Sequence, residues 1–333
     1  MTNMLPLASA LFATFALTLY VMLDGFDLGV GALLLAQPDE TQRDRMVDAI
    51  MPTWDGNETW LIMAGVTLLA AFPIAYGVLL PAFYLPLIAM LLALGLRGVS
   101  FEFRYQVDRD RRLWDRVFAV GSIVAALAQG LIVGGLIQGV AVADGESFTG
   151  SVLDVFRPFA LLTALSVLAG YTVLGGGWLH LKATGALRAF SERVLRRVTP
   201  LFVGLAAAAC IAAAFIQPGV HAAWSAHEVL LASIVGVFLV VSGMLMRGIG
   251  LSPDGRPFFL GLALFASGVL GLGITIFPDI VPFRVSLWAA ASSTLSHVFL
   301  LVGAVVVTPV VLAYSAFSYR VFRGKTPARG WEA

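Results

Sequence analysis

The chain has 333 residues, of which 59% are hydrophobic and only 12% are charged, and its mean hydropathy is +0.91. This composition lies outside the range of soluble domains and predicts an all-α, polytopic membrane protein with no segment left for a soluble domain. The net charge of +1 gives no sign of a nucleic-acid partner.

Apolar runs long enough to cross a bilayer recur along the whole chain. A hydrocarbon core of about 30 Å requires roughly 20 apolar residues per helix. The runs predict nine transmembrane helices, at residues 6–36, 56–79, 80–101, 117–142, 155–179, 198–217, 227–247, 257–277 and 289–321. No basic region precedes the first run, so we expect it to remain as a helix and not to be cleaved as a signal peptide.

The basic residues predict the orientation of these helices. Connections on one side of the membrane hold 19 of the 21 Lys and Arg residues, and the other side holds only Arg157 and Arg284. The positive-inside rule therefore places the amino terminus outside and the carboxyl terminus in the cytoplasm.

A short internal match suggests a duplication within one membrane domain, 1–333. The sequence at 28–33, Leu-Gly-Val-Gly-Ala-Leu, returns with changes at 174–179, Leu-Gly-Gly-Gly-Trp-Leu. Two four-helix bundles, 1–142 and 155–277, with an extra peripheral helix at 289–321, would fit this repeat, although the match is short.

The first helix carries two carboxyl groups inside the predicted membrane, at Asp24 and Asp27. A carboxylate there costs at least a few kcal/mol unless it is paired, hydrated or protonated, so a functional role is the default interpretation. Three residues apart, the two groups share one helix face and could carry protons. The alternative is a buried ion pair with an arginine such as Arg97 or Arg104.

A second cluster, Trp54-Asp55-Gly56-Asn57-Glu58-Thr59-Trp60, stands at the cytoplasmic start of the second helix. Asp55 and Glu58 could form a capping box that satisfies free N–H groups at the helix start. Asn57 and two tryptophans exceed what a cap requires, although Trp54 and Trp60 could be interfacial anchors.

The end of the third helix holds Arg97, Glu102 and Arg104. Most of this region is expected to be a solvated loop that fixes orientation. Arg97 and Glu102 are near enough to the helix end to form ion pairs with the acidic clusters.

Histidines and the single cysteine limit the cofactors that this chain could hold. Of four histidines, only His297 lies well inside a predicted span, and a bond to Ser293 or to a nearby carbonyl explains it better than haem ligation. Cys210 alone excludes an internal disulfide. Phosphate-binding, zinc and serine-nucleophile motifs are absent from the sequence, so we expect no metal and no catalytic residue in this chain.

The acidic, tryptophan-bearing and arginine-bearing motifs described above resemble those of subunit II of the cytochrome bd-type quinol oxidases, in particular the cyanide-insensitive branch. The resemblance rests on 24–31 (Asp-Gly-Phe-Asp-Leu-Gly-Val-Gly), on 54–62, on the arginine-bearing 97–104, and on Phe277-Pro278 with 288–293. These motifs cover about a third of the chain directly.

The resemblance implies a heterodimer whose haem-bearing subunit I holds haem b, haem d and the quinol site and reduces dioxygen to water. Subunit II would bind no haem, with a structural quinone or lipid and small accessory subunits left open. It would deliver cytoplasmic protons along a path that begins at Asp55 and continues near Asp27, Asp24 and Glu58, although some relatives carry Gln at the last position. Trp60, with Trp54 and Asn57, would lie at an oxygen route or at the subunit interface.

A stand-alone proton-coupled transporter or channel that uses the same carboxylates is the alternative. Transporters typically carry broken helices at the bilayer midplane in corresponding halves. Here the carboxylates gather toward one face, and the later half lacks an acidic counterpart.

Overall fold

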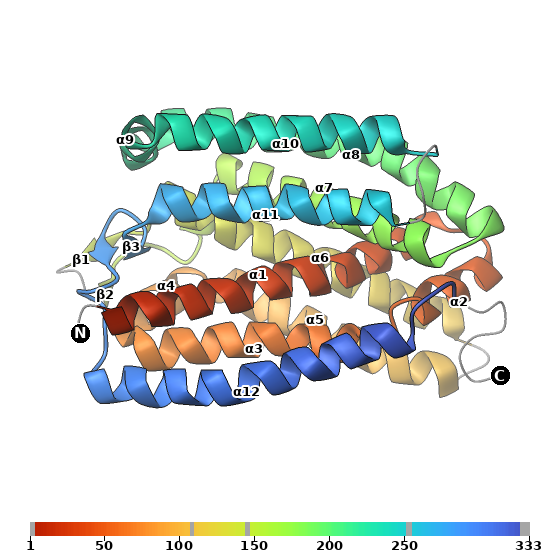
Figure 1. Ribbon diagram of the computed structural model, residues 1–333, viewed down its shortest axis with the longest axis horizontal. Coiled ribbons are helices and arrows are strands. Elements are labelled where there is room, and N and C mark those ends of the chain that lie inside the picture. The colour runs from red at the N-terminus through yellow and green to blue at the C-terminus, as the bar shows by residue number, and fades with distance from the viewer. Residues whose placement is uncertain (1–3, 107–109, 144–146, 251–254, 327–333) are drawn as a thin grey trace.

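The computed structural model describes residues 4–106, 110–143, 147–250 and 255–326, which form an elongated helical bundle (Figure 1). Its long helices are α1 (Met4–Leu33), α3 (Trp54–Ala71), α5 (Tyr84–Gln106), α6 (Arg111–Gln138), α7 (Pro158–Lys182), α8 (Gly185–Ile216), α10 (Glu228–Gly248), α11 (Arg256–Ile276) and α12 (Thr294–Val321). Shorter helices are η1 (Leu34–Ala36), α2 (Glu40–Asp48), α4 (Pro73–Ala82), η2 (Asp154–Phe156) and α9 (Pro218–Ala226).

Within the described ranges, eight helices are long and apolar enough to cross a membrane, which makes the chain a multi-pass membrane protein. They are α1 extended through η1, together with α5, α6, α7, α8, α10, α11 and α12. The 18-residue α3 runs beside α1 but is not one of the eight, because its only window of 18 residues includes the polar first turn with Asp55, Asn57 and Glu58. Nine membrane crossings and the arrangement in two four-helix bundles therefore remain predictions.

The second predicted helix, 56–79, is not continuous. It breaks at Phe72, whose ψ of 63° leaves the helical region, and Pro73 then starts α4. Proline has no N–H to donate to the preceding turn. Ser292, from the segment before α12, instead donates its N–H to the Ala71 carbonyl and its hydroxyl to the Ala70 carbonyl.

The two ends of the bundle differ in structure. One end, here called the hairpin end, carries the starts of α1 and α12 and two small antiparallel pairs. These pairs are β1 (Val142–Ala143) with β2 (Ser147–Phe148), and β3 (Asp279–Val281) with β4 (Val285–Ser286). The opposite end, called the α2 end, carries α2 and the last turn of α12 (Figure 1). The predicted ninth helix starts at Thr294 and not at 289, because β3, β4 and a turn occupy the residues before it.

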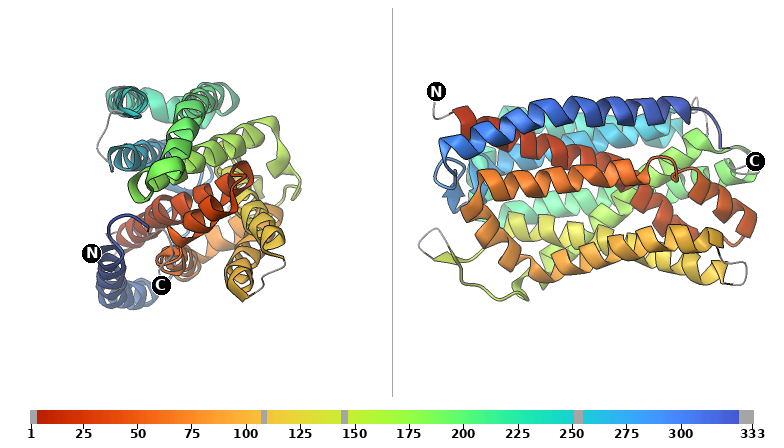
Figure 2. Two further views of the ribbon diagram at one scale, coloured as in Figure 1. Left: turned by 90° about the vertical axis from the view of Figure 1, so that its right-hand side faces the viewer. Right: turned by 90° about the horizontal axis from the view of Figure 1, so that it is seen from below.

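Helix α1 lies near the middle of the bundle, whereas α12 lies at its periphery (Figure 2). Glycines allow α1 to pack closely on α7. A Cβ on Gly29 would lie 1.8 Å from the Tyr171 carbonyl oxygen, and a Cβ on Gly175 would lie 2.4 Å from the Gly29 carbonyl carbon. The two copies of the glycine-leucine motif therefore pack against each other, which would suit a duplicated fold.

Candidate functional site

The acidic residues of α1 are buried where α1, α3 and α5 meet. Asp24 and Asp27 are both completely inaccessible to solvent, and so is Arg97 of α5. Asn57, in the first turn of α3, is also buried, and Glu58 is partly buried beside it. These five residues, which come from three helices, are called the α1–α3–α5 cluster below.

Arg97 joins two carboxyl groups of this cluster. Its Nη2 atom lies 2.7 Å from Asp24 Oδ1 and 3.4 Å from Glu58 Oε1. A buried ion pair of this kind is strongly destabilised when one partner is removed, because the other charge is then left uncompensated. The ion-pair alternative for Asp24 therefore matches the geometry, and its partner is Arg97 and not Arg104.

Asp27 has a different environment. Its Oδ2 accepts a hydrogen bond of 2.7 Å from Asn57 Nδ2, and Tyr319 of α12 donates its hydroxyl to Asn57 Oδ1 at 2.9 Å. No ion pair to Asp27 occurs within the described part of the chain. The two aspartates, although three residues apart on one helix, thus bind separate partners.

A small pocket connects this hydrogen-bonded row to the surface at the α2 end. It has a volume of about 40 Å³ and lies between the start of α3 and the second half of α12. Asp55, which is exposed, lines the pocket together with Asn57 and Tyr319. A buried water requires about 10–15 Å³ of such volume, so the pocket is large enough for water.

Several buried polar atoms of the cluster make no hydrogen bond to any described residue. They are Asp24 Oδ2, Asp27 Oδ1, Glu58 Oε1, and Arg97 Nε and Nη1, and the Trp60 indole nitrogen is a further example. The large majority of buried polar atoms in proteins are hydrogen-bonded, either to other protein groups or to ordered water. The cluster therefore offers several hydrogen-bonding positions for water.

The capping box at Asp55 and Glu58 is not formed. The N-cap of α3 is Thr53, and no side chain caps the helix. The preceding turn already pairs the first N–H groups, since Trp54 N donates to the Ile50 carbonyl oxygen at 3.2 Å. Asp55 is therefore left free to face the pocket and the surface.

The two tryptophans occupy different places. Trp60 is completely buried, packs in a cluster with Ala16 and Tyr20, and has its ring edge-on to Phe15 at 5.8 Å. Trp54 is partly buried and stacks on Phe101 with ring centroids 4.8 Å apart. Trp60 is therefore not an exposed interfacial anchor.

Arg104 and Glu102 lie apart from the cluster. Arg104 bonds to Asp115 through Nε at 2.6 Å and also contacts Asp44, while Arg43 Nε reaches the other Asp115 oxygen at 2.7 Å. This network joins α2, α5 and α6 at the α2 end. Glu102 is exposed, and its predicted ion pair is not formed with any described residue.

Sequence reasoning missed a second buried polar row. Gln129 of α6 donates to the Tyr20 hydroxyl at 2.8 Å and accepts from the Tyr171 hydroxyl at 2.5 Å. Tyr20 lies one helical turn before Asp24 on the same face of α1. Two features of the sequence could have indicated this row: the amide of Gln129 inside the apolar α6, and the tyrosines Tyr20 and Tyr171 inside predicted spans.

The predicted bond between the His297 side chain and Ser293 is not formed. The His297 Nδ1 atom lies 2.8 Å from the Ser9 hydroxyl of α1, because the starts of α1 and α12 lie together at the hairpin end. No group of three or more His, Cys, Asp or Glu side chains within the described ranges is arranged to hold a metal.

Comparisons with known proteins agree with this architecture. The family model for cytochrome bd terminal oxidase subunit II matches residues 5–322. A chain of the solved bd oxidase from Geobacillus thermodenitrificans superposes with a TM-score of 0.79, covering 96% of this chain and 98% of that one. Its sequence identity is 14%, so this likeness shows the fold alone.

Curated relatives match over part of their length. The chain is 41% identical over 172 residues to a probable cytochrome oxidase subunit 2 of Haemophilus influenzae, and 35% identical over 175 residues to the cytochrome bd-I ubiquinol oxidase subunit 2 of Escherichia coli K12. Each alignment covers 50% of this chain and 46% of the relative, so the chain spans about half the length of the curated relatives it matches. Because the family model covers most of the chain, the protein belongs to the cytochrome bd terminal oxidase subunit II family.

Proposed function

We propose that this chain is the haem-free subunit II of a bd-type terminal quinol:oxygen oxidoreductase in a bacterial inner membrane. It supports a haem-bearing subunit I and delivers cytoplasmic protons for the reduction of dioxygen to water. In this proposal the α2 end faces the cytoplasm, which agrees with the predicted positions of the basic connections.

The observation that carries the proposal is the continuous row from the pocket at Asp55 to the buried carboxyl of Asp27. Asn57 and Tyr319 line the pocket, and Asn57 also donates directly to Asp27. Asp55 takes a proton at the surface, water in the pocket passes it inward, and Asp27 holds it inside the membrane. The bilayer interior offers no other medium for proton movement than such ionisable or hydrated groups.

The charge balance of the α1–α3–α5 cluster supports the same role. One guanidinium, that of Arg97, pairs with the carboxyl groups of Asp24 and Glu58, while Asp27 of the same cluster has no ion pair within the described part of the chain. A single positive charge cannot compensate all three carboxyl groups in a low-dielectric interior, so the cluster has more acidic groups than its cation can pair. The unpaired polar atoms provide positions where water can link these groups.

The positions of the buried histidines in the described ranges support the proposal that this chain binds no haem. The buried ones are His180, at the last turn of α7, and His297, at the first turn of α12. They lie at opposite ends of the bundle, and His180 contacts Glu192 at 3.5 Å. In this proposal, as the resemblance implies, the b-type and d-type haems and the quinol site lie in subunit I, where electron transfer to dioxygen occurs. Trp60 and Trp54 remain candidates for the oxygen route or the interface with that subunit.

Purification of the tagged chain from its native membrane tests this function. We expect a haem-bearing partner to copurify with the chain and the complex to consume oxygen when quinol is supplied. A chain that purifies alone and moves protons across liposomes would instead support a transporter.

A further inference from the structure

The only lysines in the sequence are Lys182 and Lys325, and every other basic residue among the 21 is an arginine. Lys182 is the last residue of α7, and Lys325 follows shortly after the end of α12. A lysine ammonium is a compact charge with three donors, so it can bind backbone carbonyl oxygens without the planar geometry that a guanidinium requires. Both lysines are used in this way.

Each lysine donates a hydrogen bond to the carbonyl end of the other helix. Lys182 Nζ lies 2.6 Å from the carbonyl oxygen of Phe322, the C-cap residue of α12. Lys325 Nζ lies 2.9 Å from the carbonyl oxygen of Leu181, in the last turn of α7. The last carbonyl groups of a helix lack partners within the helix and carry partial negative charge, so a cation stabilises them. The two lysines and the carbonyl groups that they bind are called the lysine clasp below.

The lysine clasp is buried, unlike most charged groups at a helix end. Lys182 is 7% exposed and Thr326 is 4% exposed. Thr326 donates its backbone N–H to the Lys182 carbonyl oxygen at 2.9 Å. The Lys182 ammonium also lies 5.0 Å from the centroid of the Trp178 ring, within the range of a cation–π interaction. These contacts attach the chain that follows α12 to the end of α7.

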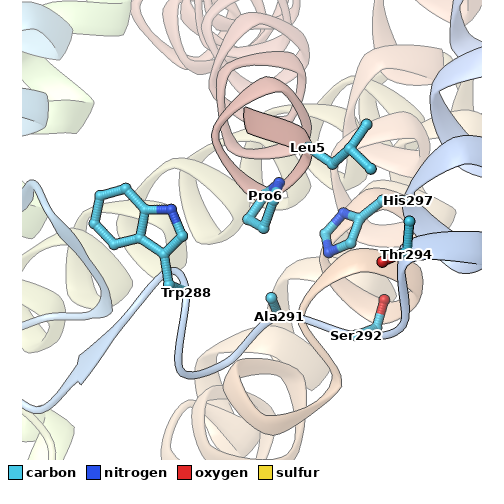
Figure 3. Close-up of a pocket in the computed structure, with 7 residues that line it drawn as sticks. All are labelled: Leu5, Pro6, Trp288, Ala291, Ser292, Thr294 and His297. Atoms are coloured by element: carbon cyan, nitrogen blue, oxygen red, sulfur yellow. The ribbon is translucent and has the colours of Figure 1, made fainter. Parts of the chain in front are cut away.

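Helix α12 depends on this attachment because it lies at the periphery of the bundle (Figure 2). At its start, His297 bonds to Ser9 of α1 at 2.8 Å. A pocket of about 200 Å³ lies beside this bond, between the first residues of α1 and the segment before α12 (Figure 3). The hairpin end of α12 is therefore incompletely packed, and the position of its second half depends on contacts at the α2 end.

The contacts at the α2 end meet at Tyr319. Its ring packs edge-on against Trp178 at 6.0 Å, so one indole contacts both Lys182 and Tyr319. The Tyr319 hydroxyl donates to Asn57 Oδ1 at 2.9 Å, and Asn57 Nδ2 donates to Asp27 Oδ2 at 2.7 Å. An amide has an acceptor on one side and donors on the other. By donating to the oxygen, Tyr319 keeps the nitrogen of Asn57 turned toward Asp27.

The same half of α12 also forms a wall of the pocket at Asp55. Ser315, Ser318 and Tyr319 line that pocket opposite the start of α3. Ser318 donates its hydroxyl to the Pro52 carbonyl oxygen at 3.0 Å, at the mouth of the pocket. A shift of α12 would therefore change both the shape of the pocket and the hydrogen bond that orients Asn57.

We propose that the lysine clasp positions α12 for proton delivery: Lys182 and Lys325 attach α12 to α7, and Tyr319 then orients the Asn57 amide toward Asp27. The inference rests on the proposed function. Lys182, Lys325 and Tyr319 are positioning residues, and the proton itself passes through water in the pocket to Asp27. When the clasp is open, α12 moves outward and the Asn57 amide loses the partner that fixes its orientation.

Four variants of the purified complex test this inference. Lys182→Met keeps most of the apolar stem and removes the ammonium. Tyr319→Phe keeps the ring on Trp178 and removes the hydroxyl. The third variant combines both substitutions. Arg323→Met is the matched control, because it removes an exposed cation from the same segment and leaves both lysines in place.

We expect oxygen consumption to fall about fivefold in Lys182→Met and in Tyr319→Phe, with native haem content and a native KM for quinol. Because proton delivery then limits turnover, the ratio of the rates in H2O and D2O should rise in both variants, which a loss of stability alone would not cause. The double variant should stay within about twofold of the slower single variant, because both substitutions act on one amide. Arg323→Met should keep the native rate and the native ratio.

Native oxygen consumption in Lys182→Met, or effects that multiply in the double variant, would overturn the inference. If Lys182→Met does not assemble, Lys325→Met carries the same test, since it opens the clasp and leaves the buried ammonium in place. A slowed Asp55→Asn complex together with a native Lys182→Met complex would refute the role of the clasp alone. Native rates in both would refute the proposed proton path as well.

Discussion

Arg97 is the residue whose loss should disturb the α1–α3–α5 cluster most. It is completely buried and lies 2.7 Å from Asp24. Arg97→Gln would leave the Asp24 carboxylate buried without its cation, at a cost of about 3–5 kcal/mol. We expect a clearly lower thermal unfolding midpoint for the purified complex, with partial recovery in Arg97→Gln/Asp24→Asn. A single variant with the native midpoint would show that Asp24 does not depend on Arg97.

Asp27→Asn should separate the structural role of this residue from its proton-carrying role. The Asn carbonyl oxygen can still accept the hydrogen bond from Asn57 Nδ2, so the fold is preserved. The substituted side chain cannot take up a proton. We expect normal assembly and haem content, with slowed quinol oxidation. Assembly loss together with activity loss would make Asp27 a structural residue only.

At the residue scale, the sequence predicted the members of the cluster better than their partners. Buried carboxylates stand out in an apolar helix, and Arg97 follows at the end of another span, so a pairing could be anticipated. Tyr319 and Gln129 were harder to predict, because uncharged polar residues inside spans give only a weak signal. Their roles depend on how α12 and α6 pack against α1, which a single sequence does not specify.

The contact between α1 and α7 is the element-scale feature with the strictest steric requirement. A Cβ on Gly29 would lie 1.8 Å from the Tyr171 carbonyl oxygen. Gly29→Ala must push the helices apart, and such overpacking costs about 1–3 kcal/mol or more. Gly204→Ala in α8 is a matched control, because nothing lies within 4 Å of its added Cβ. We expect reduced yield and a lower unfolding midpoint for Gly29→Ala alone, and equal stability of both variants would contradict the close packing.

Hydropathy predicted the long helices because each has to bury its backbone polar groups in the apolar interior. Helix boundaries were less predictable. The stretch 56–79 is apolar throughout its second half, so hydropathy passes over the break at Phe72 and Pro73. The segment 289–293, Ala-Ala-Ala-Ser-Ser, leads into the next apolar run, but it lies outside α12 and bonds to the end of α3 through Ser292.

At the scale of the whole molecule, the orientation can be tested by thiol labelling in intact cells. In a Cys210→Ser background, a cysteine replaces either His221, in α9 at the hairpin end, or Arg193, near the start of α8. Both positions are exposed on the chain. We expect a membrane-impermeant maleimide to label His221→Cys in intact cells and Arg193→Cys only after lysis. Labelling of Arg193→Cys in intact cells would show that this position faces outward and would contradict the predicted orientation.

The most direct test of proton delivery is the quinol-driven oxygen consumption of the Asp55→Asn complex. Asp55 is exposed and lines the pocket that leads through Asn57 to Asp27, and it does not cap α3, so the substitution should leave the fold intact. Glu102→Gln is the matched control, because it also removes an exposed carboxylate from the α2 end. We predict full assembly and haem content in both variants, with oxygen consumption reduced roughly tenfold or more in Asp55→Asn only. Native oxygen consumption and native proton uptake in Asp55→Asn would contradict the proposed path.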